Sequence, residues 1–328
     1  MRPKPREILK KANLSALLVS SPTNVRYLSG APDGGLLLVL PMKYILLADS
    51  LSLESAKAGV YDDVKVLGEV ETTLLQKIPH CGIESEDVTI ARLARWKRKF
   101  KSTKFVQTDD IVEEFRRSKD STELKKMNRA HRITKEILRR IPASLRGGIR
   151  EDQLAWKIET WARELGAEGM AFPSIVAFGQ NTSRPHHIPT NRKLVKGDIV
   201  QIDIGAKYQG YCSDRSDVFF TGKPTLEQKK AYVAVFEAKE KAKAAVKVGA
   251  STKKLDSIAR EVLKKYKLDQ YFIHSLGHGV GLDIHEGARL SSHAGDQKLL
   301  KNEVITIEPG VYFPGKFGIR LEDMVVVE

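Results

Sequence analysis

The segment His274–Glu286, HSLGHGVGLDIHE, carries three histidines among alternating glycines. Each glycine lowers the stability of a helix by about 1 kcal/mol. The alternation of Gly277, Gly279 and Gly281 therefore favours an extended or bulged segment that another backbone or a ligand approaches closely. These residues alone leave two interpretations open: a metal or substrate site, or a turn whose histidines form local hydrogen bonds. Carboxylates elsewhere in the chain have to decide between them.

Asp203 and Asp214, in the stretches IVQIDIG and GYCSD, form the first candidate carboxylate pair. If the chain turns at Tyr208 and Gln209, the two aspartates lie directly opposite each other in an antiparallel ladder. Opposed side chains share one face of the sheet at a distance of about 4.5–5.5 Å. Two carboxylates so close repel each other unless a positive charge lies between them. The pair therefore predicts a metal site, with the alternative that one aspartate is only a turn residue.

A second acidic pair consists of Glu308 and Glu322, whose positions are centred on Gly315 in the loop FPGKF. Both glutamates stand among apolar strand residues, where an unpaired carboxylate is costly to bury. A hairpin with this centre places the two glutamates opposite each other. The alternative is that each forms a salt bridge, to Arg320 or to Lys316.

Four carboxylates and one imidazole are a ligand set suited to two divalent ions about 3.5–4 Å apart. One histidine of the segment His274–Glu286 would complete this set, and the other histidines would face the substrate. The carboxylate pairs thus favour the metal-site interpretation of that segment.

The first part of the chain alternates strand and helix patterns. The runs ALLVSS, GLLLVLPM and YILLAD have the length and composition of buried strands. The stretches DSLSLESAKAG and RLARWKRKF read as helices. We expect residues 1–118 to form an α/β domain.

The remainder, residues 119–328, predicts a domain of a different class. A helix capped by Asp120 or Ser121 starts it. The buried side of this helix is expected to carry Leu124, Ala130, Ile133, Ile137 and Leu138. REDQLAWKIETWARELG forms a second helix. Strand patterns between about 170 and 220 and at the C-terminus flank two lysine-rich helices. We expect an α+β domain with a curved, mainly antiparallel sheet and outer helices.

Composition narrows the class of protein. The 328 residues are 41% hydrophobic, which excludes a disordered chain, and no apolar run approaches the length of a membrane span. The net charge is +14, but basic residues concentrate in helix-like stretches such as 91–104, so nucleic-acid binding is disfavoured. The two cysteines, Cys81 and Cys212, imply no disulfide framework. We expect a cytoplasmic protein.

Four motifs, in the order DIGAKYQGYCSD, GHGVGLDIHE, TIEPGVY and IRLED, resemble those of the pita-bread metallopeptidases. They are most similar to Xaa-Pro dipeptidases (prolidases), with aminopeptidase P as a near relative. GAEGMAFPSIVAFGQNTSRPHHIPT resembles the substrate segment of this family, and SPTNVRYLSG resembles the N-terminal domain shared with creatinases. The resemblance covers nearly the whole chain. It implies a pita-bread catalytic domain, two divalent ions (Mn, Co, Fe or Zn), a small peptide substrate and a homodimer.

The resemblance also implies roles for individual residues. His186 and His285 correspond to histidines that contact the scissile group, and Glu308 corresponds to a proton shuttle. His274 matches a substrate-side histidine. Arg289 and Arg320 match positions that hold substrate carboxylates or neighbouring ligands. The implied metal ligands are Asp203, Asp214, His278, Glu308 and Glu322.

Two further residues near the implied site, one histidine and one tyrosine, are expected to support it without taking part in the chemistry. His187 is expected at the surface or as support behind the site, and Tyr312 as packing in its wall. The sequence departs from the family after the second aspartate, where SDRSDVF keeps a hydroxyl at Ser216 but has Asp217 and Val218 in place of the usual Arg and Thr.

Three functions remain to be weighed. The first is hydrolysis of Xaa-Pro dipeptides, and the second is release of a residue that precedes proline in longer peptides, as by aminopeptidase P. The third is a non-enzymatic pita-bread module that binds protein or RNA through its basic surface. All five implied ligands are present, which disfavours the third.

Overall fold

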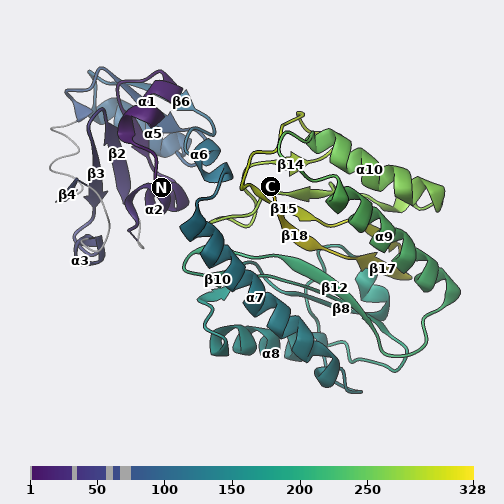
Figure 1. Ribbon diagram of the computed structural model, residues 1–328. Helices are drawn as coiled ribbons and strands as arrows, with labels where there is room; N and C mark the ends of the chain where they lie inside the picture. The colour runs from purple at the N-terminus through teal and green to yellow at the C-terminus, as the bar shows by residue number, and fades with distance from the viewer. Residues whose placement is uncertain (1, 32–34, 57–61, 67–74) are drawn as a thin grey trace. The chain divides into compact units, whose positions relative to one another are not determined.

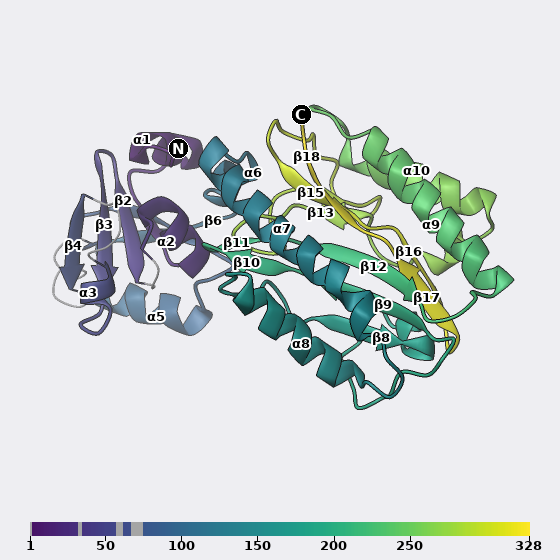
Figure 2. The same ribbon diagram turned by 60° about the horizontal axis from the view of Figure 1, so that its bottom comes forward.

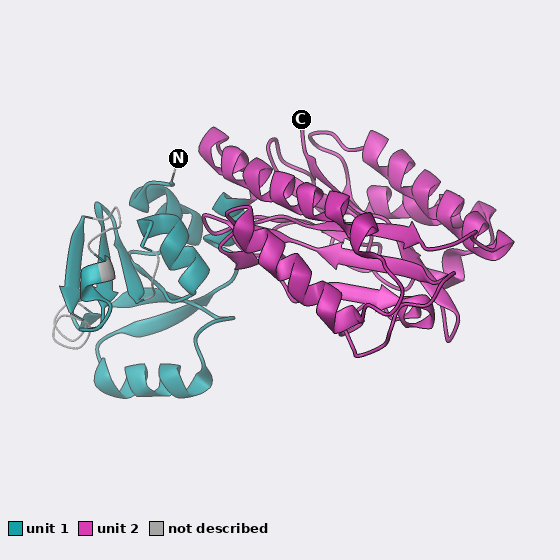
Figure 3. Cartoon of the chain, turned by 90° about the horizontal axis from the view of Figure 1, so that it is seen from below, with its two compact units in different colours: residues 1–116 teal, residues 117–328 magenta. Residues whose placement is uncertain are grey.

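The structure is a computed structural model that describes residues 2–31, 35–56, 62–66 and 75–328. It divides into two compact units, residues 1–116 and 117–328 (Figure 3). Each unit is described separately.

Unit 1 is built on a six-stranded mixed sheet in the order β4-β3-β2-β1-β5-β6. Strand β1 pairs antiparallel with β2 and parallel with β5. Neighbouring residues of β2 alternate between two apolar clusters, with Leu37 and Val39 in one and Leu36 and Leu38 in the other, so both faces of the sheet are covered. The predicted α/β class is confirmed. The strands are β1 (Leu17–Val19), β2 (Leu36–Leu40), β3 (Lys43–Ala48), β4 (Asp63–Val66), β5 (His80–Glu84) and β6 (Lys104–Thr108).

The helices of unit 1 are short. The predicted basic helix is present as α5, capped by Thr89, whose side chain accepts a hydrogen bond from the N–H of Arg92. Of the helix predicted from DSLSLESAKAG, the structure has α3, and the last part of that stretch lies outside the described residues. The helices are α1 (Pro5–Ala12), α2 (Pro22–Ser29), α3 (Leu53–Ala56), α5 (Ile90–Lys99) and, across the division between the units, α6 (Glu113–Arg117).

Unit 2 contains short strands whose pairings, as far as the structure describes them, are all antiparallel. The expected mainly antiparallel sheet is therefore confirmed. The strands are β7 (Gly169–Met170), β8 (Ile175–Phe178), β9 (Ile199–Ile204), β10 (Ala206–Tyr208), β11 (Tyr211–Cys212), β12 (Arg215–Phe220), β13 (Gly277–His278), β14 (Arg289–Leu290), β15 (Val304–Ile307), β16 (Gly310–Phe313), β17 (Phe317–Arg320) and β18 (Asp323–Val326).

Four long helices of unit 2 lie outside the strands in two side-by-side pairs, as Figure 1 and Figure 2 both show. One pair is α7 (Ser121–Ser144) and α8 (Glu151–Glu164), and the other is α9 (Leu226–Ala244) and α10 (Thr252–Lys265). Two 3-10 turns, η1 (Gly179–Ser183) and η2 (Asp269–Tyr271), complete the unit. In the part of the chain that the structure describes, no helix is long and apolar enough to span a membrane.

Helix α7 begins where the sequence predicts. Asp120 accepts hydrogen bonds from the N–H groups of Thr122 and Glu123, and the Glu123 side chain accepts one from the N–H of Asp120. This capping box satisfies donors that the first helical turn leaves unpaired. Of the residues expected on its buried side, Leu124 is only half-buried. The others are buried as predicted: Ala130, Ile133, Ile137 and Leu138.

The helices pack on one side of the strands, and the polar residues face the other side. In β9, Val200, Ile202 and Ile204 belong to the core under α7 and α8, so Asp203 points away from those helices. The same alternation in β15 directs Ile305 and Ile307 to the core under α9 and α10. The side of the strands opposite the helices is therefore where the acidic residues gather.

The predicted register of the first acidic pair is wrong by two residues. Asp203 pairs with Ser216, not with Asp214. The reason is the turn, because Gln209 and Gly210 both have positive φ (48° and 84°), which centres a tight hairpin turn one position later than predicted. A shift of two residues keeps every side chain on its original face, so both aspartates still point to one side.

The predicted register of the second pair is confirmed. Gly310 pairs with Arg320 in one ladder, and Ile307 pairs with Asp323 in the next. Both ladders are centred on Gly315, whose φ of 71° makes the loop turn. Glu308 and Glu322 lie between these pairs and therefore stand opposite each other.

Candidate metal centre

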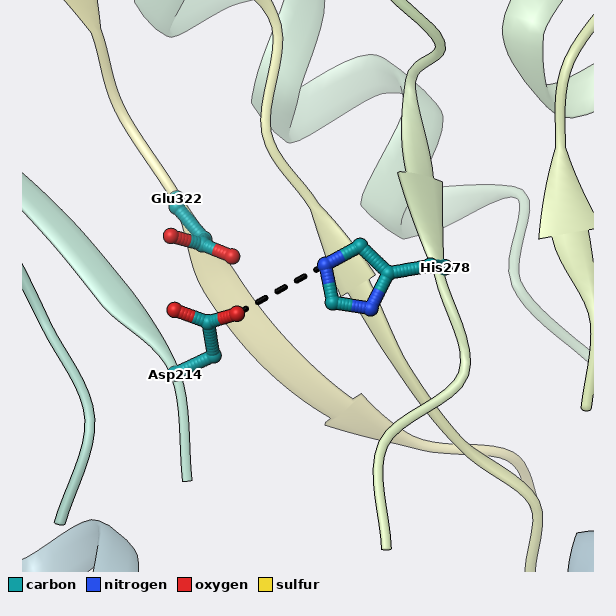
Figure 4. Close-up of side chains that lie close together, drawn as sticks. All are labelled: Asp214, His278 and Glu322. Atoms are coloured by element: carbon teal, nitrogen blue, oxygen red, sulfur yellow. Dashed lines mark ion pairs between the residues drawn. The ribbon is translucent and has the colours of Figure 1, made fainter. Parts of the chain in front are cut away.

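Asp214, His278 and Glu322 converge from three separate segments, each offering one ligand atom within 4.8 Å of the others (Figure 4). His278 lies on β13, Asp214 just before β12, and Glu322 between β17 and β18. The Nε2 atom of His278 is 3.6 Å from Asp214 Oδ2 and 3.4 Å from Glu308 Oε1. Four of the five predicted ligands thus lie side by side.

The ring of His278 is oriented for metal ligation. Its Nδ1 lies 3.1 Å from the carbonyl oxygen of Gly279, which is an acceptor, so Nδ1 carries the proton and Nε2 presents its lone pair. Burial, together with the nearby His285, lowers the pKa of His278 to about 4. A neutral imidazole lone pair that faces two ionised carboxylates is unfavourable unless a cation or a proton lies between them.

The buried carboxylates around His278 carry more negative charge than the surrounding side chains compensate. Burial and then the charges of neighbouring carboxylates raise the pKa values of Asp214 and Glu322 well above their ordinary range. Burial raises the pKa of Glu308 to about 8. Asp203 Oδ1 and Glu322 Oε1 are buried without a hydrogen-bond partner. Buried polar atoms are almost always paired, so these orphaned oxygens fit the ligand positions of divalent cations.

Arg320, predicted to hold a substrate carboxylate or a neighbouring ligand, pairs with the predicted ligand Asp203. Its guanidinium forms an ion pair with Asp203 and donates to Ser216 Oγ at 3.0 Å and to Tyr312 Oη at 2.7 Å. Ser216 in turn donates to Glu322 Oε2 at 3.0 Å. The alternative salt bridges proposed for the glutamates do not form with Lys316 either, since that residue pairs with Glu227 at 3.5 Å.

Tyr312 and His274 extend this network. Because Tyr312 accepts from Arg320, its own hydroxyl donates to His274 Nε2 at 3.0 Å, and His274 Nδ1 donates to Ser275 O at 2.8 Å. Burial, with the charge of Arg320, lowers the pKa of His274 to about 4 and keeps the ring neutral. Tyr312, expected only as wall packing, is thus also a hydrogen-bonded link.

The remaining predicted residues lie at the exposed edge of this cluster. His285 is exposed, and its ring centroid lies 4.2 Å from that of His278. Partial burial and the charges of His186 and Arg289 lower the pKa of His285. Arg289 is exposed and is the ladder partner of His278. His186 is exposed as well.

The alternating glycines behave as the sequence suggests. A Cβ atom on Gly277 would lie 2.1 Å from the carbonyl oxygen of Thr306, and one on Gly279 would lie 2.0 Å from that of Glu286. Glycine is therefore required where neighbouring backbone approaches the histidine-bearing segment.

Comparisons with known proteins agree with this centre. Residues 125–328 match the metallopeptidase family M24, and residues 2–118 match the creatinase/prolidase N-terminal domain. The chain belongs to metallopeptidase family M24. The predicted metallopeptidase activity class and the resemblance to prolidases are confirmed.

The proteins similar to this chain include both Xaa-Pro dipeptidases and an X-Pro aminopeptidase. An Xaa-Pro dipeptidase of Pyrococcus horikoshii is 35% identical over 98% of this chain and 92% of its own length. The crystal structure of the prolidase from Pyrococcus horikoshii has a TM-score of 0.93 at 34% identity, covering 98% of this chain and 94% of that one. The X-Pro aminopeptidase from Thermotoga maritima has a TM-score of 0.90 at 33% identity, with 98% and 95% covered. These matches confirm the pita-bread fold.

Asp217, which stands where the family pattern has an arginine, has its negative charge compensated by Arg215. Arg215 donates to Asp217 at 3.1 Å and to Asp323 at 2.9 Å. Asp323 also accepts from Lys239 at 2.9 Å and Lys243 at 2.7 Å. Burial alone would raise the pKa of Asp323, but the two lysines outweigh it and lower the pKa to about 2. Three cations therefore surround the residue next to Glu322.

Two supporting residues of this metallopeptidase escaped the sequence reasoning. Thr306 Oγ1 accepts from the N–H of His278 at 3.0 Å and donates to Glu308 Oε1 at 3.2 Å. Its position two residues before Glu308, on the same face of β15, was a usable signal. Glu151 Oε2 lies 2.8 Å from Nε2 of His187, which is buried and therefore acts as support. In the sequence, an acidic residue in the first turn of a helix indicates only stabilisation of the helix end, so nothing predicted the role of Glu151.

Proposed function

We propose that this chain is an Xaa-Pro dipeptidase that uses two divalent ions, with catalysis carried out by residues 119–328. The observation that supports it most is the buried donor set, in which neutral His278 faces Asp214 and Glu308. In the same set, Asp203 and Glu322 each carry a buried oxygen without a hydrogen-bond partner. The five proposed ligands are Asp203, Asp214, His278, Glu308 and Glu322. When bound, such ions supply a water that is deprotonated near neutral pH and polarise the substrate carbonyl.

The protein's own groups then bind and orient the peptide and move protons. Glu308, held by the hydroxyl of Thr306, is proposed to carry the proton from the attacking water to the departing proline nitrogen. His285 and His186, exposed at the edge of the centre, are proposed to donate hydrogen bonds to the scissile group. His274, which accepts from Tyr312 and is kept neutral by burial and the charge of Arg320, is proposed to contact the substrate as well.

The proline end of the substrate needs a cation. Arg320 is buried and bonded to Asp203, Ser216 and Tyr312, so it supports the site instead of binding substrate. Arg289 is exposed beside His278 and is the residue proposed to bind the free carboxylate of the dipeptide, for which a guanidinium fork is well suited.

A cavity of about 580 Å³ adjoins Tyr312, whose hydroxyl links Arg320 to His274, and this cavity is proposed to admit the peptide. Its lining includes Arg184, Tyr271, Ile273, Tyr312 and Gly315. Aminopeptidase P-like cleavage of longer chains is the second candidate, supported by the similarity to the Thermotoga maritima X-Pro aminopeptidase.

Rates on Met-Pro, Met-Pro-amide and Met-Pro-Ala separate the two candidates. A dipeptidase requires the free carboxylate directly after proline, so kcat/KM for the amide and the tripeptide should be at least roughly 30-fold lower. Comparable rates on all three would reject the dipeptidase in favour of aminopeptidase P-like activity. The metal identity, the homodimer and the cytoplasmic location inferred from the sequence remain predictions.

A further inference from the structure

Glu151, the first residue of α8, is fully buried and receives five hydrogen bonds. Its Oε1 accepts from the N–H of Phe178 at 2.8 Å and from Asn181 Nδ2 at 2.9 Å. Its Oε2 lies 2.8 Å from His187 Nε2 and accepts from the N–H and the hydroxyl of Thr190 at 3.0 and 2.6 Å. Burial alone would raise the pKa of Glu151, but these hydrogen bonds outweigh it and lower the pKa. An ionised carboxylate only accepts, so His187 Nε2 carries the proton.

The four residues that bond the Glu151 carboxylate all belong to one segment, residues 178–190, and they lie at both of its ends. The middle of this segment carries His186, which is exposed. His186 is flanked by two anchored neighbours, since the carbonyl oxygen of Pro185 accepts from Arg320 Nη1 at 3.2 Å and His187 is bound to Glu151. Arg320 also pairs with the proposed ligand Asp203, so the residue before His186 is tied to the metal centre. The charge of His186 accordingly contributes to the lowered pKa values of His274 and His285.

We propose that Glu151 is a positioning residue that sets the orientation of His186 toward the scissile bond through His187. This inference rests on the proposed function, in which His186 contacts the substrate. The carboxylate ties both ends of this segment to the start of α8. Supporting groups of this kind typically change activity by 10–100-fold when they are altered.

The decisive variant is Glu151→Gln, which keeps the size of the side chain but replaces one acceptor oxygen with an amide donor. Because Oε1 accepts from two donors and Oε2 from three, at least two of the five donors then face another donor, so the segment has to shift. We expect kcat/KM for Met-Pro to fall about 10–100-fold. The amount of bound metal, measured by elemental mass spectrometry, should stay at the wild-type level. An unchanged kcat/KM would overturn the proposal.

A double-mutant cycle separates positioning from general stability. If Glu151 acts through His186, Glu151→Gln should cause less than about a threefold further loss in a His186→Ala background. Equal losses in both backgrounds would show a merely structural role. Glu84→Gln is a matched control, because Glu84 is a buried carboxylate of unit 1 that accepts from Ser20, Ser21 and Asn24. Any loss it causes should be the same in both backgrounds.

Two further measurements keep the test independent of folding and of substrate. If Glu151→Gln does not fold, His187→Leu should lose activity and His187→Gln, which retains an N–H donor, should restore most of it; equal activities would overturn the proposal. A crystal structure of the variant that folds should show the His186 ring displaced from its wild-type position. A wild-type enzyme that cleaves none of the Xaa-Pro peptides would reject the proposed function, whereas an undisplaced His186 ring would reject the role of Glu151.

Discussion

Lys119 Nζ lies 2.9 Å from Glu286 Oε1, and both side chains are almost completely buried, at 2% and 3% exposed. Glu286 directly follows His285, and its carboxylate also accepts from the N–H of Asp283 at 3.2 Å. The ion pair therefore anchors the loop that carries a proposed substrate-binding histidine. A Cβ atom on Gly281 would lie 2.0 Å from the same carboxylate, so the loop leaves no room for rearrangement.

Removing one partner of this pair should be strongly destabilising. Lys119→Met leaves the Glu286 carboxylate buried without its cation, and we expect a loss of about 3–5 kcal/mol in the free energy of unfolding. Urea unfolding measures it. The double variant Lys119→Met/Glu286→Gln should be less destabilised than Lys119→Met alone, because no uncompensated charge remains. A single variant as stable as the wild type would show that the pair contributes nothing.

Metal content tests the ligand set. The wild-type protein should bind about two divalent ions per chain. Asp214→Asn and Glu308→Gln each remove an anionic ligand but no packing, so both variants should lose metal and activity while circular dichroism stays unchanged. Full metal occupancy together with full activity in these variants would contradict the assignment.

Arg289 should determine the preference for a free carboxylate. Arg289→Ala should reduce the difference in kcat/KM between Met-Pro and Met-Pro-amide from at least roughly 30-fold to a few-fold, because the amide never used the guanidinium. Arg139→Ala, at an exposed arginine on α7, serves as control and should retain the discrimination. Bound metal should be unchanged in both variants. If the discrimination survives the loss of Arg289, the carboxylate is bound elsewhere.

His131 on α7 should make stability fall in acid. Burial, together with the charges of Arg215 and Lys135, lowers its pKa from 6.5 to about 4. Below pH 6.5 the unfolded chain binds a proton that the folded chain does not, so stability is lost as the pH falls from about 6.5 to about 4. The expected contribution is about 3 kcal/mol. His131→Leu, studied by urea unfolding of the metal-free protein, should show a shallower fall over this range; identical pH profiles would contradict it.

The chain should associate into a dimer, as the resemblance to prolidases implies. Sedimentation equilibrium at micromolar concentration should give a mass near twice the 36.7 kDa of one chain. A mass equal to that of a single chain would remove the homodimer from the proposal.

The sequence by itself determined the elements and most of the ligand chemistry. The pairing of Glu308 with Glu322 followed from a short hairpin centred on Gly315, and apolar alternation in β9 and β15 placed the acidic residues on one face. Such features depend on neighbours within a few residues, so periodicity and turn chemistry are enough to predict them.

The tertiary structure decided the rest. The positive φ at Gln209 moved the ladder so that Asp203 faces Ser216, and a turn conformation of a non-glycine residue is not visible in the spacing of the aspartates. Arg320 could equally have bound substrate, but packing buried it against Asp203, 117 positions away in sequence. Glu151 and His187 meet in the same way. Contacts between distant segments depend on how elements pack, and no local pattern records which buried charges will meet.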